Sequence, residues 1–352
     1  METPLTIEGP VCPVPLAHNE QIVMGHGSGG KMSHDLIRKT FLAAFDNSIL
    51  RTGDDAAPLQ INATRLAVST DSHVVTPLFF PGGDIGRLAV CGTVNDVAML
   101  GARPLYLTAG FILEEGLPIE TLRRVVESMS AAAKEAGVQI VAGDTKVVEK
   151  GKADGLYVNT TGIGEILPNV HIGGANARPG DVVLLSGSIG DHGIAVLGAR
   201  GELGFTSDIQ SDVAPLNRLI EAMLDASPDV RVLRDPTRGG LATTLNEIAA
   251  QSNVTILLNE QAIPVHPAVS AACEMLGFDP LYVANEGKLI AIVPPASADK
   301  ILRALRATKY GEDAAIIGEV SEGNRARVLM KTSIGTTRVV DMLAGEMLPR
   351  IC

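Results

Sequence analysis

Hydrophobic positions follow two different periods along the first half of the chain. Runs of β-branched and apolar residues, each bounded by turn-forming residues, predict strands at 65–70, 104–113, 138–143 and 156–166. Between these runs, apolar side chains recur at helical spacing and predict helices at 84–100 and 120–136, with Asp84 as the N-cap of the first. The pattern predicts a domain in which strands and helices alternate.

A second block follows the stretch "HIGGANARPGD", whose Gly, Asn and Pro residues are typical of a linker. Helical patterns lie near 213–224, 239–250 and 297–307. Strand-like runs lie between and after them: "VVLLSG", "VTILL", "LIAIV", "AAIIGEV", "RVLMK" and "TTRVVDML". We therefore expect an α+β protein, divided into an arm at 1–20, an N-terminal domain at 21–168, a C-terminal domain at 169–343 and a tail at 344–352.

Composition narrows the class of protein. Hydrophobic residues make up 46% of the 352 positions, which is enough for two cores, and the net charge of −11 argues against nucleic acid or an anionic membrane as the main partner. The four cysteines form no CxxC pair, so we expect a reducing, cytoplasmic location rather than a disulfide framework. Neither a signal peptide nor an apolar run of about 18 residues is recognisable.

The stretch "GHGSGGKMS" is the first glycine-rich loop. Gly25, Gly30 and Lys31 satisfy the GxxxxGK spacing of a phosphate-binding loop, but Met32 stands where Ser or Thr would hold magnesium. This favours a glycine-rich flap over a nucleotide rather than a true P-loop domain, and a plain surface loop is the simpler alternative. The residues expected to contact the nucleotide here are Gly27, Gly29, Gly30 and Lys31.

Acidic residues recur beside Gly, Thr or Asn, often at strand ends, in "GDDAAP", "STDSHVV", "VNDVAMLGA", "AGDTKVV" and "DPTRGG". Hard oxygen ligands beside glycine-rich loops are what a magnesium–nucleotide site uses. Any single Asp is more often a cap or turn former, and we expect that simpler role for one of Asp54 and Asp55. The candidates for metal or phosphate are Asp54, Asp55, Asp71, Asp96, Asp144 and Asp235.

Three further motifs carry possible chemistry. Gly239 and Gly240 begin a predicted helix, where backbone N–H groups can approach phosphate. The loop "SGSIGDHG" fits a phosphate site and a tight strand-to-helix turn equally well. Glu286 in "NEGK" and Lys146 in "GDTK" form a possible proton-transfer pair, although each alone is more often a surface charge.

The chain ends in "LPRIC", so Cys352 is both a thiol and the terminal carboxylate. The nine residues after Leu343 show no helical or strand period and would reach about 30 Å when extended. Such a mobile tail can carry its thiol into a site on its own or on a neighbouring subunit.

Together the runs "GHGSGGK", "GDDAA", "FPGGDIGRLAVCGTVNDVAMLGA", "GDTKVV", "DPTRGGLATTLNEIA" and "NEGK", with the terminal "PRIC", resemble the HypE family of [NiFe]-hydrogenase maturation factors. That family belongs to the ATP-using superfamily of aminoimidazole ribonucleotide synthetase and selenophosphate synthetase. The resemblance runs from about residue 21 to the end, and the terminal cysteine is its most specific element.

The resemblance implies an N-terminal domain that forms a homodimer through its sheet, with ATP and Mg²⁺ in a cleft beside it. A carbamoyltransferase, HypF, would load a carboxamide onto Cys352. ATP would then drive its dehydration to S-cyanide, for delivery to iron on a HypC–HypD complex. It further implies metal and phosphate roles for Asp54, Asp55, Asp71, Asp96 and Asp235, and nucleotide or substrate positioning by Asn95, Asp144 and Thr145. Proton transfer would fall to Glu286 and Lys146.

Two alternatives stay open on the residues alone. One is a superfamily synthetase that acts on a free small molecule, and the other is a non-catalytic scaffold whose tail docks a partner. The terminal Cys352 counts against the first, because a free substrate needs no carrier thiol. The acidic and glycine motifs count against the second.

Overall fold

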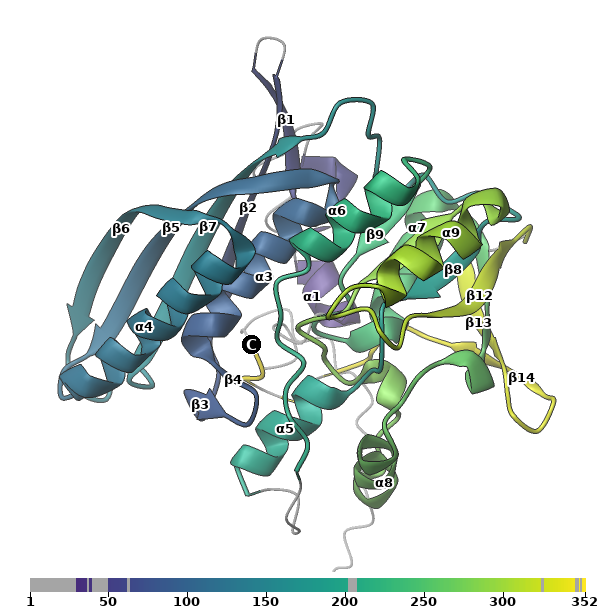
Figure 1. Ribbon diagram of the computed structural model, residues 1–352. Coiled ribbons are helices and arrows are strands. Elements are labelled where there is room, and N and C mark those ends of the chain that lie inside the picture. Colours follow the sequence, from purple (N-terminus) through teal and green to yellow (C-terminus); the bar gives the residue numbers. More distant parts are fainter. Residues whose placement is uncertain are drawn as a thin grey trace, which may run out of the picture.

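The structure is a computed structural model that describes residues 30–36, 38–39, 50–61, 64–201, 208–323, 326–345, 348 and 350–352. Within these ranges two mixed α and β domains lie side by side (Figure 1). The expected α+β class is confirmed. No helix among the described residues is long and apolar enough to cross a membrane.

The N-terminal domain is built on a five-stranded sheet of order β1-β2-β7-β5-β6. Its neighbouring strands are antiparallel except for the parallel pair β5–β6. The strands are β1 (Ala57–Ile61), β2 (Thr64–His73), β5 (Ala102–Glu114), β6 (Gln139–Val148) and β7 (Leu156–Ile166), beside a small ribbon of β3 (Phe79–Phe80) and β4 (Gly83–Asp84).

Helices α3 (Ile85–Met99) and α4 (Ile119–Ala136) cover one face of this sheet (Figure 1). Asp84 caps α3 as predicted, because its carboxylate accepts the N–H groups of Gly86 and Arg87 at 2.7 and 3.1 Å. Helix α3 is buried almost all round, since the sheet lies on one side and the C-terminal domain on the other.

The C-terminal domain contains a seven-stranded sheet of order β14-β13-β10-β12-β8-β11-β9. Its strands are β8 (Val182–Leu185), β9 (Val232–Arg234), β10 (Thr255–Asn259), β11 (Ile290–Val293), β12 (Ala315–Ser321), β13 (Arg327–Lys331) and β14 (Thr337–Val340). Its helices are α5 (Asp191–Ala199), α6 (Asn217–Ala226), α7 (Gly240–Ser252), α8 (Pro267–Leu276) and α9 (Pro295–Arg306). The helix predicted near 213 begins later, at Asn217.

The two domains share a core. Ala98 and Met99 at the end of α3 belong to the same buried cluster as Leu184 and Leu216 of the C-terminal domain. Helix α1 (Lys31–Leu36) comes early in the chain, yet it contacts the C-terminal domain through His34, which hydrogen-bonds to Glu247 of α7 at 2.8 Å. Short 3₁₀ turns occur at η3 (Leu50–Thr52), η4 (Glu260–Ala262) and η5 (Pro280–Tyr282).

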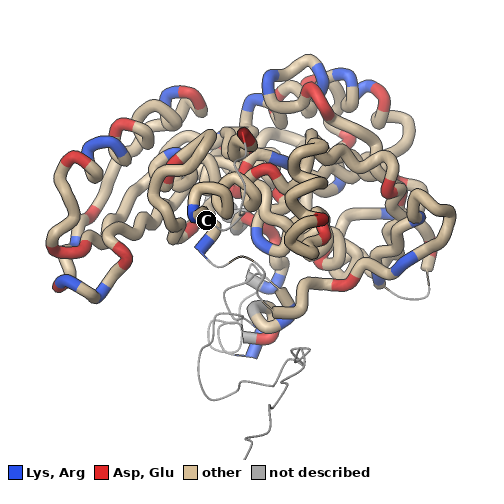
Figure 2. Tube along the Cα trace, turned by 90° about the horizontal axis from the view of Figure 1, so that it is seen from below, with Lys and Arg blue, Asp and Glu red and all other residues tan. Residues whose placement is uncertain are grey.

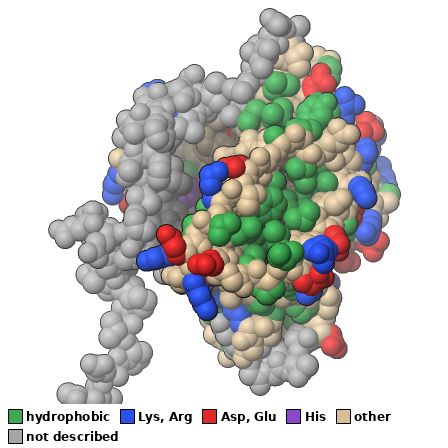
Figure 3. Space-filling view, turned by 90° about the vertical axis from the view of Figure 1, so that its left-hand side faces the viewer, with side chains coloured by type: hydrophobic (Ala, Val, Ile, Leu, Met, Phe, Trp, Pro, Cys, Tyr) green, Lys and Arg blue, Asp and Glu red, His purple; other side chains and the backbone are tan. Residues whose placement is uncertain are grey.

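The face of the N-terminal sheet that α3 and α4 leave uncovered exposes apolar side chains. Tyr106 and Ile112 of β5 are almost half exposed, and hydrophobic side chains gather on this side of the molecule with charged ones around them (Figure 3). Elsewhere acidic and basic positions are interspersed over both domains (Figure 2).

Candidate functional site

The end of the tail is docked in its own subunit. Ile351 forms an antiparallel bridge with Val75, just beyond β2. The Val74 N–H donates to the Cys352 carbonyl at 2.9 Å, and the Thr76 N–H donates to the Arg350 carbonyl at 3.3 Å. Ile351 is only 3% exposed and belongs to the N-terminal core cluster. The chain end therefore adds a short strand segment beside the segment that follows β2.

This docking places the Cys352 thiol among charged groups. Burial raises the pKa of the thiol far above its ordinary value; Arg238 opposes the rise, while Glu286, Asp71 and a hydrogen bond to Glu286 add to it. The docked thiol is therefore neutral. The pKa of the Arg238 guanidinium is raised as well, by the neighbouring acidic groups with Cys352 first and Asp71 and Glu286 after it, while burial acts to lower it.

Glu286 is the carboxyl that hydrogen-bonds to the Cys352 thiol. It is 4% exposed, its N–H donates to the Asp212 carboxylate at 2.9 Å, and its Oε1 has no hydrogen-bond partner among the described residues. Burial raises the pKa of Glu286 well above its ordinary value, and the charges of Asp71, Asp212 and Asp235 add to the rise.

Four predicted acids come together beside this carboxyl, and we call Asp55, Asp71, Asp96 and Asp235 the acid cluster. Burial raises the pKa of Asp96 well above its ordinary value, and the other three members of the cluster raise it further. Burial raises the pKa of Asp235 to about 6, against the attraction of Arg234. Four carboxyls from separate parts of the chain thus share one low-dielectric region.

Arg234 neutralises part of the cluster. Its guanidinium lies 2.6 Å from the Asp55 carboxylate and 2.5 Å from that of Glu247, which also holds His34. This chain of ion pairs ties helix α1 to the acid cluster. Arg234 was not among the predicted residues, although its place before Asp235 in the sequence was a usable signal.

The acid cluster suits a cation that would also take ligands from a bound molecule. The Oδ2 atom of Asp55 is buried and has no hydrogen-bond partner among the described residues, and the cluster holds more acid than Arg234 neutralises. Within the same residues no group of three or more His, Cys, Asp or Glu side chains converges on one point as a metal site. The donors present thus suit a magnesium ion that takes further oxygen ligands from phosphate.

Two predicted nucleotide contacts, Asp54 and Asn95, form hydrogen bonds with main chain in this fold. The Asp54 carboxylate accepts the N–H of Gly174 at 2.7 Å and so binds the segment that joins the domains. Both polar atoms of the Asn95 side-chain amide bond to main chain. The amide nitrogen donates to the Ala214 carbonyl at 3.0 Å, and the amide oxygen accepts the Leu216 N–H at 2.8 Å. Asn95 therefore fixes the C-terminal domain against α3.

Strand β6 carries Asp144, Thr145 and Lys146, and it does not bring them to Cys352 of the same subunit. Lys146 is exposed and its ammonium group forms an ion pair with Asp144 at 2.6 Å. It pairs across the sheet with Ile112 on the uncovered face, whereas Asp71 faces α3. Three strand spacings, about 14 Å, also separate β6 from β2. Thr145 pairs with Phe111, whose side chain packs toward the core on the α4 side.

The glycines predicted to contact phosphate lie in different surroundings. Gly27 and Gly29 lie outside the described residues. Gly30 packs against the main chain where the tail begins, since an added Cβ would collide with the Leu343 carbonyl and the Lys31 N–H donates to that carbonyl at 3.0 Å. Gly239 and Gly240 both have positive φ (79° and 62°), and a Cβ on Gly240 would collide with the backbone of η5.

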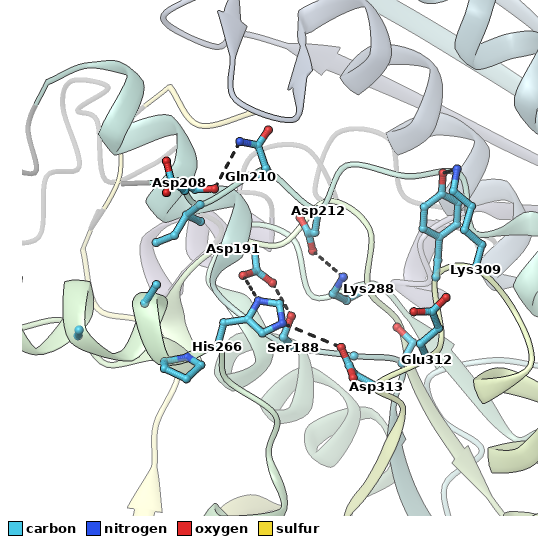
Figure 4. A pocket seen from close by; sticks show the side chains of 17 residues that line it. Ser188, Asp191, Asp208, Gln210, Asp212, His266, Lys288, Lys309, Glu312 and Asp313 are labelled. Atoms are coloured by element: carbon cyan, nitrogen blue, oxygen red, sulfur yellow. Dashed lines mark hydrogen bonds and ion pairs between the residues drawn. The ribbon is translucent and has the colours of Figure 1, made fainter. Parts of the chain in front are cut away.

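The loop "SGSIGDHG" has two faces. His192, on α5, points toward the tail, where its Nε2 lies 2.7 Å from the Ile351 carbonyl. The other face of the loop lines a cavity of about 860 Å³ whose labelled side chains, among them Asp191, Asp212, His266 and Lys288, all come from the C-terminal domain (Figure 4). None of the acid cluster lines this cavity. His192 is a tail contact that the sequence did not reveal.

Comparison with known proteins gives first the class of protein and then the family. The family models described as "AIR synthase related protein" match the chain, the N-terminal domain model over residues 53–166 and the C-terminal domain model over residues 178–331. The fold, with its acid cluster between the two domains, is therefore that of the AIR synthase-related proteins.

Within that class, the chain is 59% identical to the carbamoyl dehydratase HypE of Cupriavidus necator over 333 residues, covering 94% of this chain and 95% of that protein. It is 49% identical to the carbamoyl dehydratase HypE of Escherichia coli, with 94% and 99% covered. The chain belongs to the HypE family of carbamoyl dehydratases, which are enzymes of hydrogenase maturation.

Solved structures agree. A crystal structure of HypE in complex with ATP matches at 55% identity and a TM-score of 0.80, covering 94% of this chain and all of that one. HypE in a HypE–HypF complex matches at 52% identity and a TM-score of 0.84, with 88% and 99% covered. A kinase of Aquifex aeolicus, thiamine monophosphate kinase, is 18% identical with a TM-score of 0.64 and shares the fold alone.

Proposed function

We propose that the protein uses ATP to dehydrate a carboxamide carried on the sulfur of its own Cys352, giving the S-cyanide that becomes a ligand of the hydrogenase iron. One observation carries this proposal. The tail of the chain is docked so that the Cys352 thiol lies beside Glu286, with Arg238 and Asp71 of the acid cluster also near. Occupation of the site by the tail also disfavours the alternative, a synthetase for a free small molecule.

The reaction needs a leaving group and a base. Transfer of the γ-phosphate of ATP to the carboxamide oxygen supplies the leaving group, and phosphate then departs with that oxygen as the C≡N bond forms. Both protons of the nitrogen are lost overall. Glu286 is placed to accept the first, because its carboxyl touches the sulfur that bears the group. Burial raises its pKa, so it is a stronger base than an exposed glutamate once it is ionised, and the charge of a bound magnesium ion would favour that ionised form.

The acid cluster would hold the magnesium that accompanies the nucleotide. Asp71, Asp96 and Asp235 would contribute with the unpartnered oxygen of Asp55, and the charge of the ion would relieve their mutual repulsion. Gly27, Gly29, Gly30, Lys31, Gly239 and Gly240 stay candidates for phosphate contacts. We do not propose Asp54 and Asn95 as ligands, because the carboxylate of the first and the amide of the second bond to main chain.

Carbamoyl loading of Cys352 would take place with the tail in a different position. A thiol is acylated as its thiolate, and the docked environment keeps Cys352 neutral. We therefore place carbamoylation by a HypF-type carbamoyltransferase on the released tail, in keeping with the HypE–HypF complex known for a relative. A HypC–HypD complex would then accept the cyanide from the tail after a second release.

The uncovered sheet face would form a homodimer. It presents Tyr106 and Ile112, whose side chains are almost half exposed. Exposed apolar side chains gathered on one face are typical of a protein–protein interface. Lys146 and Asp144 lie on the same face, so Lys146 would serve the carboxamide of the partner subunit rather than that of its own.

A single-turnover experiment tests this proposal. Protein carbamoylated on Cys352 is mixed with Mg²⁺ and ATP, and the phosphate released is counted against Cys352. We expect about one phosphate per loaded thiol, and only background release from Cys352→Ser protein treated in the same way. Turnover of a free amide at equal rates by the natural protein and the Cys352→Ser variant would contradict the proposal.

A further inference from the structure

The last two peptide groups of the tail are held from both sides, and the residues responsible have no assigned role. We propose that His192 and Arg200 form a carbonyl-binding clamp that holds the docked tail and sets the position of Cys352, whatever group the sulfur carries. We call these two side chains the tail clamp. The inference rests on the proposed function, because it describes how the carrier is held during dehydration.

The carbonyl directions explain why a clamp is needed. In an extended segment successive carbonyls point to opposite sides. Those of Arg350 and Cys352 point toward the Val74–Thr76 segment and accept its N–H groups. Within the described part of the chain no strand pairs with the Ile351 carbonyl, and His192 meets it at 2.7 Å. His192 therefore replaces the missing neighbouring strand.

Arg200 joins the two segments. Its Nη2 donates to the Arg350 carbonyl at 2.5 Å and its Nε donates to the Thr76 carbonyl at 2.6 Å. One guanidinium thus binds the tail and the segment on which the tail lies. Such a planar, two-sided donor fixes geometry as well as adding hydrogen bonds.

The ring of His192 has a defined orientation. It is fully buried, and its Nδ1 lies 2.8 Å from the Ser211 hydroxyl. A carbonyl can only accept, so Nε2 carries the hydrogen toward Ile351 and Nδ1 accepts from Ser211. The edge-to-face contact with Phe80, with ring centroids 5.5 Å apart, further limits the ring. The donor is therefore oriented by its own helix and loop, not by the tail alone.

The clamp contacts main chain and leaves the sulfur free. Ile351 supplies the apolar anchor, while the sulfur points toward Glu286 and Arg238. The free thiol, the carboxamide and the cyanide should all be held by the same hydrogen bonds. It follows that weakening the clamp should shift the tail outward and slow dehydration without slowing loading.

Two measurements on the full-length chain test this. The first is the rate at which iodoacetamide alkylates Cys352, followed on the C-terminal peptide by mass spectrometry. The second is the pair of rates for carbamoyl loading and for ATP-dependent dehydration in a single turnover. The variants are His192→Phe, which keeps the ring and removes the donor, Arg200→Gln, and His192→Gln, whose amide N–H can restore the donor. His171→Phe, an exposed histidine in the interdomain segment, is the matched control.

We expect His192→Phe and Arg200→Gln each to raise the alkylation rate about 5- to 10-fold and to lower the dehydration rate by a similar factor, because each removes one hydrogen bond from the docked state. Loading should be unchanged or faster. His192→Gln and His171→Phe should behave like the natural protein.

Unchanged alkylation in both clamp variants would overturn the inference, and so would a parallel fall in loading and dehydration. If His192→Phe fails to fold, Arg200→Gln alone decides, since that side chain is on the surface. If the natural protein shows no dehydration at all, the proposed function fails, while the alkylation rates still test the clamp.

Discussion

The Val74 N–H donates to the Cys352 carbonyl at 2.9 Å, so the last residue of the chain has a fixed register against the segment after β2. Because Ile351 and Val75 are paired in the same bridge, a slip of one residue would move the thiol by about 3.3 Å and turn it to the other side.

An alanine inserted between Ile351 and Cys352 should therefore lower dehydration about 100-fold or more, since a misplacement of even 1 Å can cost that much. Carbamoyl loading should persist, because it occurs on the released tail. The control is an alanine inserted after Gly345, upstream of the docked end. Equal dehydration rates for the two insertions would show that register does not matter.

Glu286→Gln should keep the fold and the loading of Cys352 but lose about 100-fold or more of the dehydration rate, because an amide cannot accept the nitrogen proton. Single-turnover kinetics on loaded protein measure this. Glu312→Gln changes an exposed carboxyl of the C-terminal domain in the same way and should have no effect. If Glu286→Gln also has none, the proton leaves by another route.

Asp71→Asn should weaken the use of Mg²⁺ and ATP about 10- to 100-fold, which is the scale of a lost charge-assisted contact. Isothermal titration with Mg²⁺–ATP and single-turnover dehydration both report this loss. Carbamoyl loading needs no acid cluster on this chain and should be unchanged. Normal dehydration in this variant would remove Asp71 from the site.

Asp235 gives a pH-dependent prediction for the nucleotide-free protein. Its pKa is raised to about 6 in the folded state, so between its ordinary value and pH 6 the folded state binds more protons than the unfolded state. The free energy of unfolding should therefore fall as pH rises through this window. Asp235→Asn should remove part of that fall, on the order of 1–3 kcal/mol.

Urea denaturation at pH 4.5 and pH 7.5 measures this difference. The variant should gain stability relative to the natural protein only at the higher pH, while it loses dehydration activity. A difference in stability that is the same at both pH values would mean that Asp235 is not held in a costly ionised form at neutral pH.

Ile112→Glu should place a charge on the uncovered sheet face and convert the proposed homodimer into a monomer, which sedimentation velocity can show. Dehydration should fall with it if Lys146 acts across the dimer. Subunit mixing gives the sharper result. Lys146→Ala protein mixed with Cys352→Ser protein should regain activity, because the one subunit supplies the lysine and the other the thiol. Absence of any recovery would place Lys146 outside the reaction.

Much of the fold could be read from the sequence because its elements are long and strongly periodic. Strand β7 was predicted over its observed range, and the Asp84 cap of α3 was predicted as well. Helix α5 was not predicted, since it is apolar throughout after Asp191 and His192 and follows a glycine loop that equally suits a phosphate site. Period alone cannot identify a helix that is buried all round.

For the site, residue types could be predicted from the sequence, whereas side-chain directions could not. Acids beside strand ends were recognisable by type, and four of them do come together. Position in the sequence could not separate Asp54 from Asp55, because two neighbouring side chains of a turn point in different directions. Nor could it reveal that Lys146 and Asp71 lie on opposite faces of the sheet, since that depends on the register of four strands. His192 was out of reach for a similar reason, as its partner is 159 residues away.

Cys352 is proposed as the carrier of the group that is dehydrated, and the mass of the C-terminal peptide tests this most directly. Protein loaded with the carbamoyltransferase, carbamoyl phosphate and ATP should show a carboxamide on the peptide that contains Cys352. That peptide should then lose the mass of one water, either with time in the loading mixture or when fresh Mg²⁺–ATP is supplied to loaded protein from which the nucleotide was removed early. An adduct on Cys12, Cys91 or Cys273 instead, or a carboxamide on Cys352 that never loses water, would contradict the account.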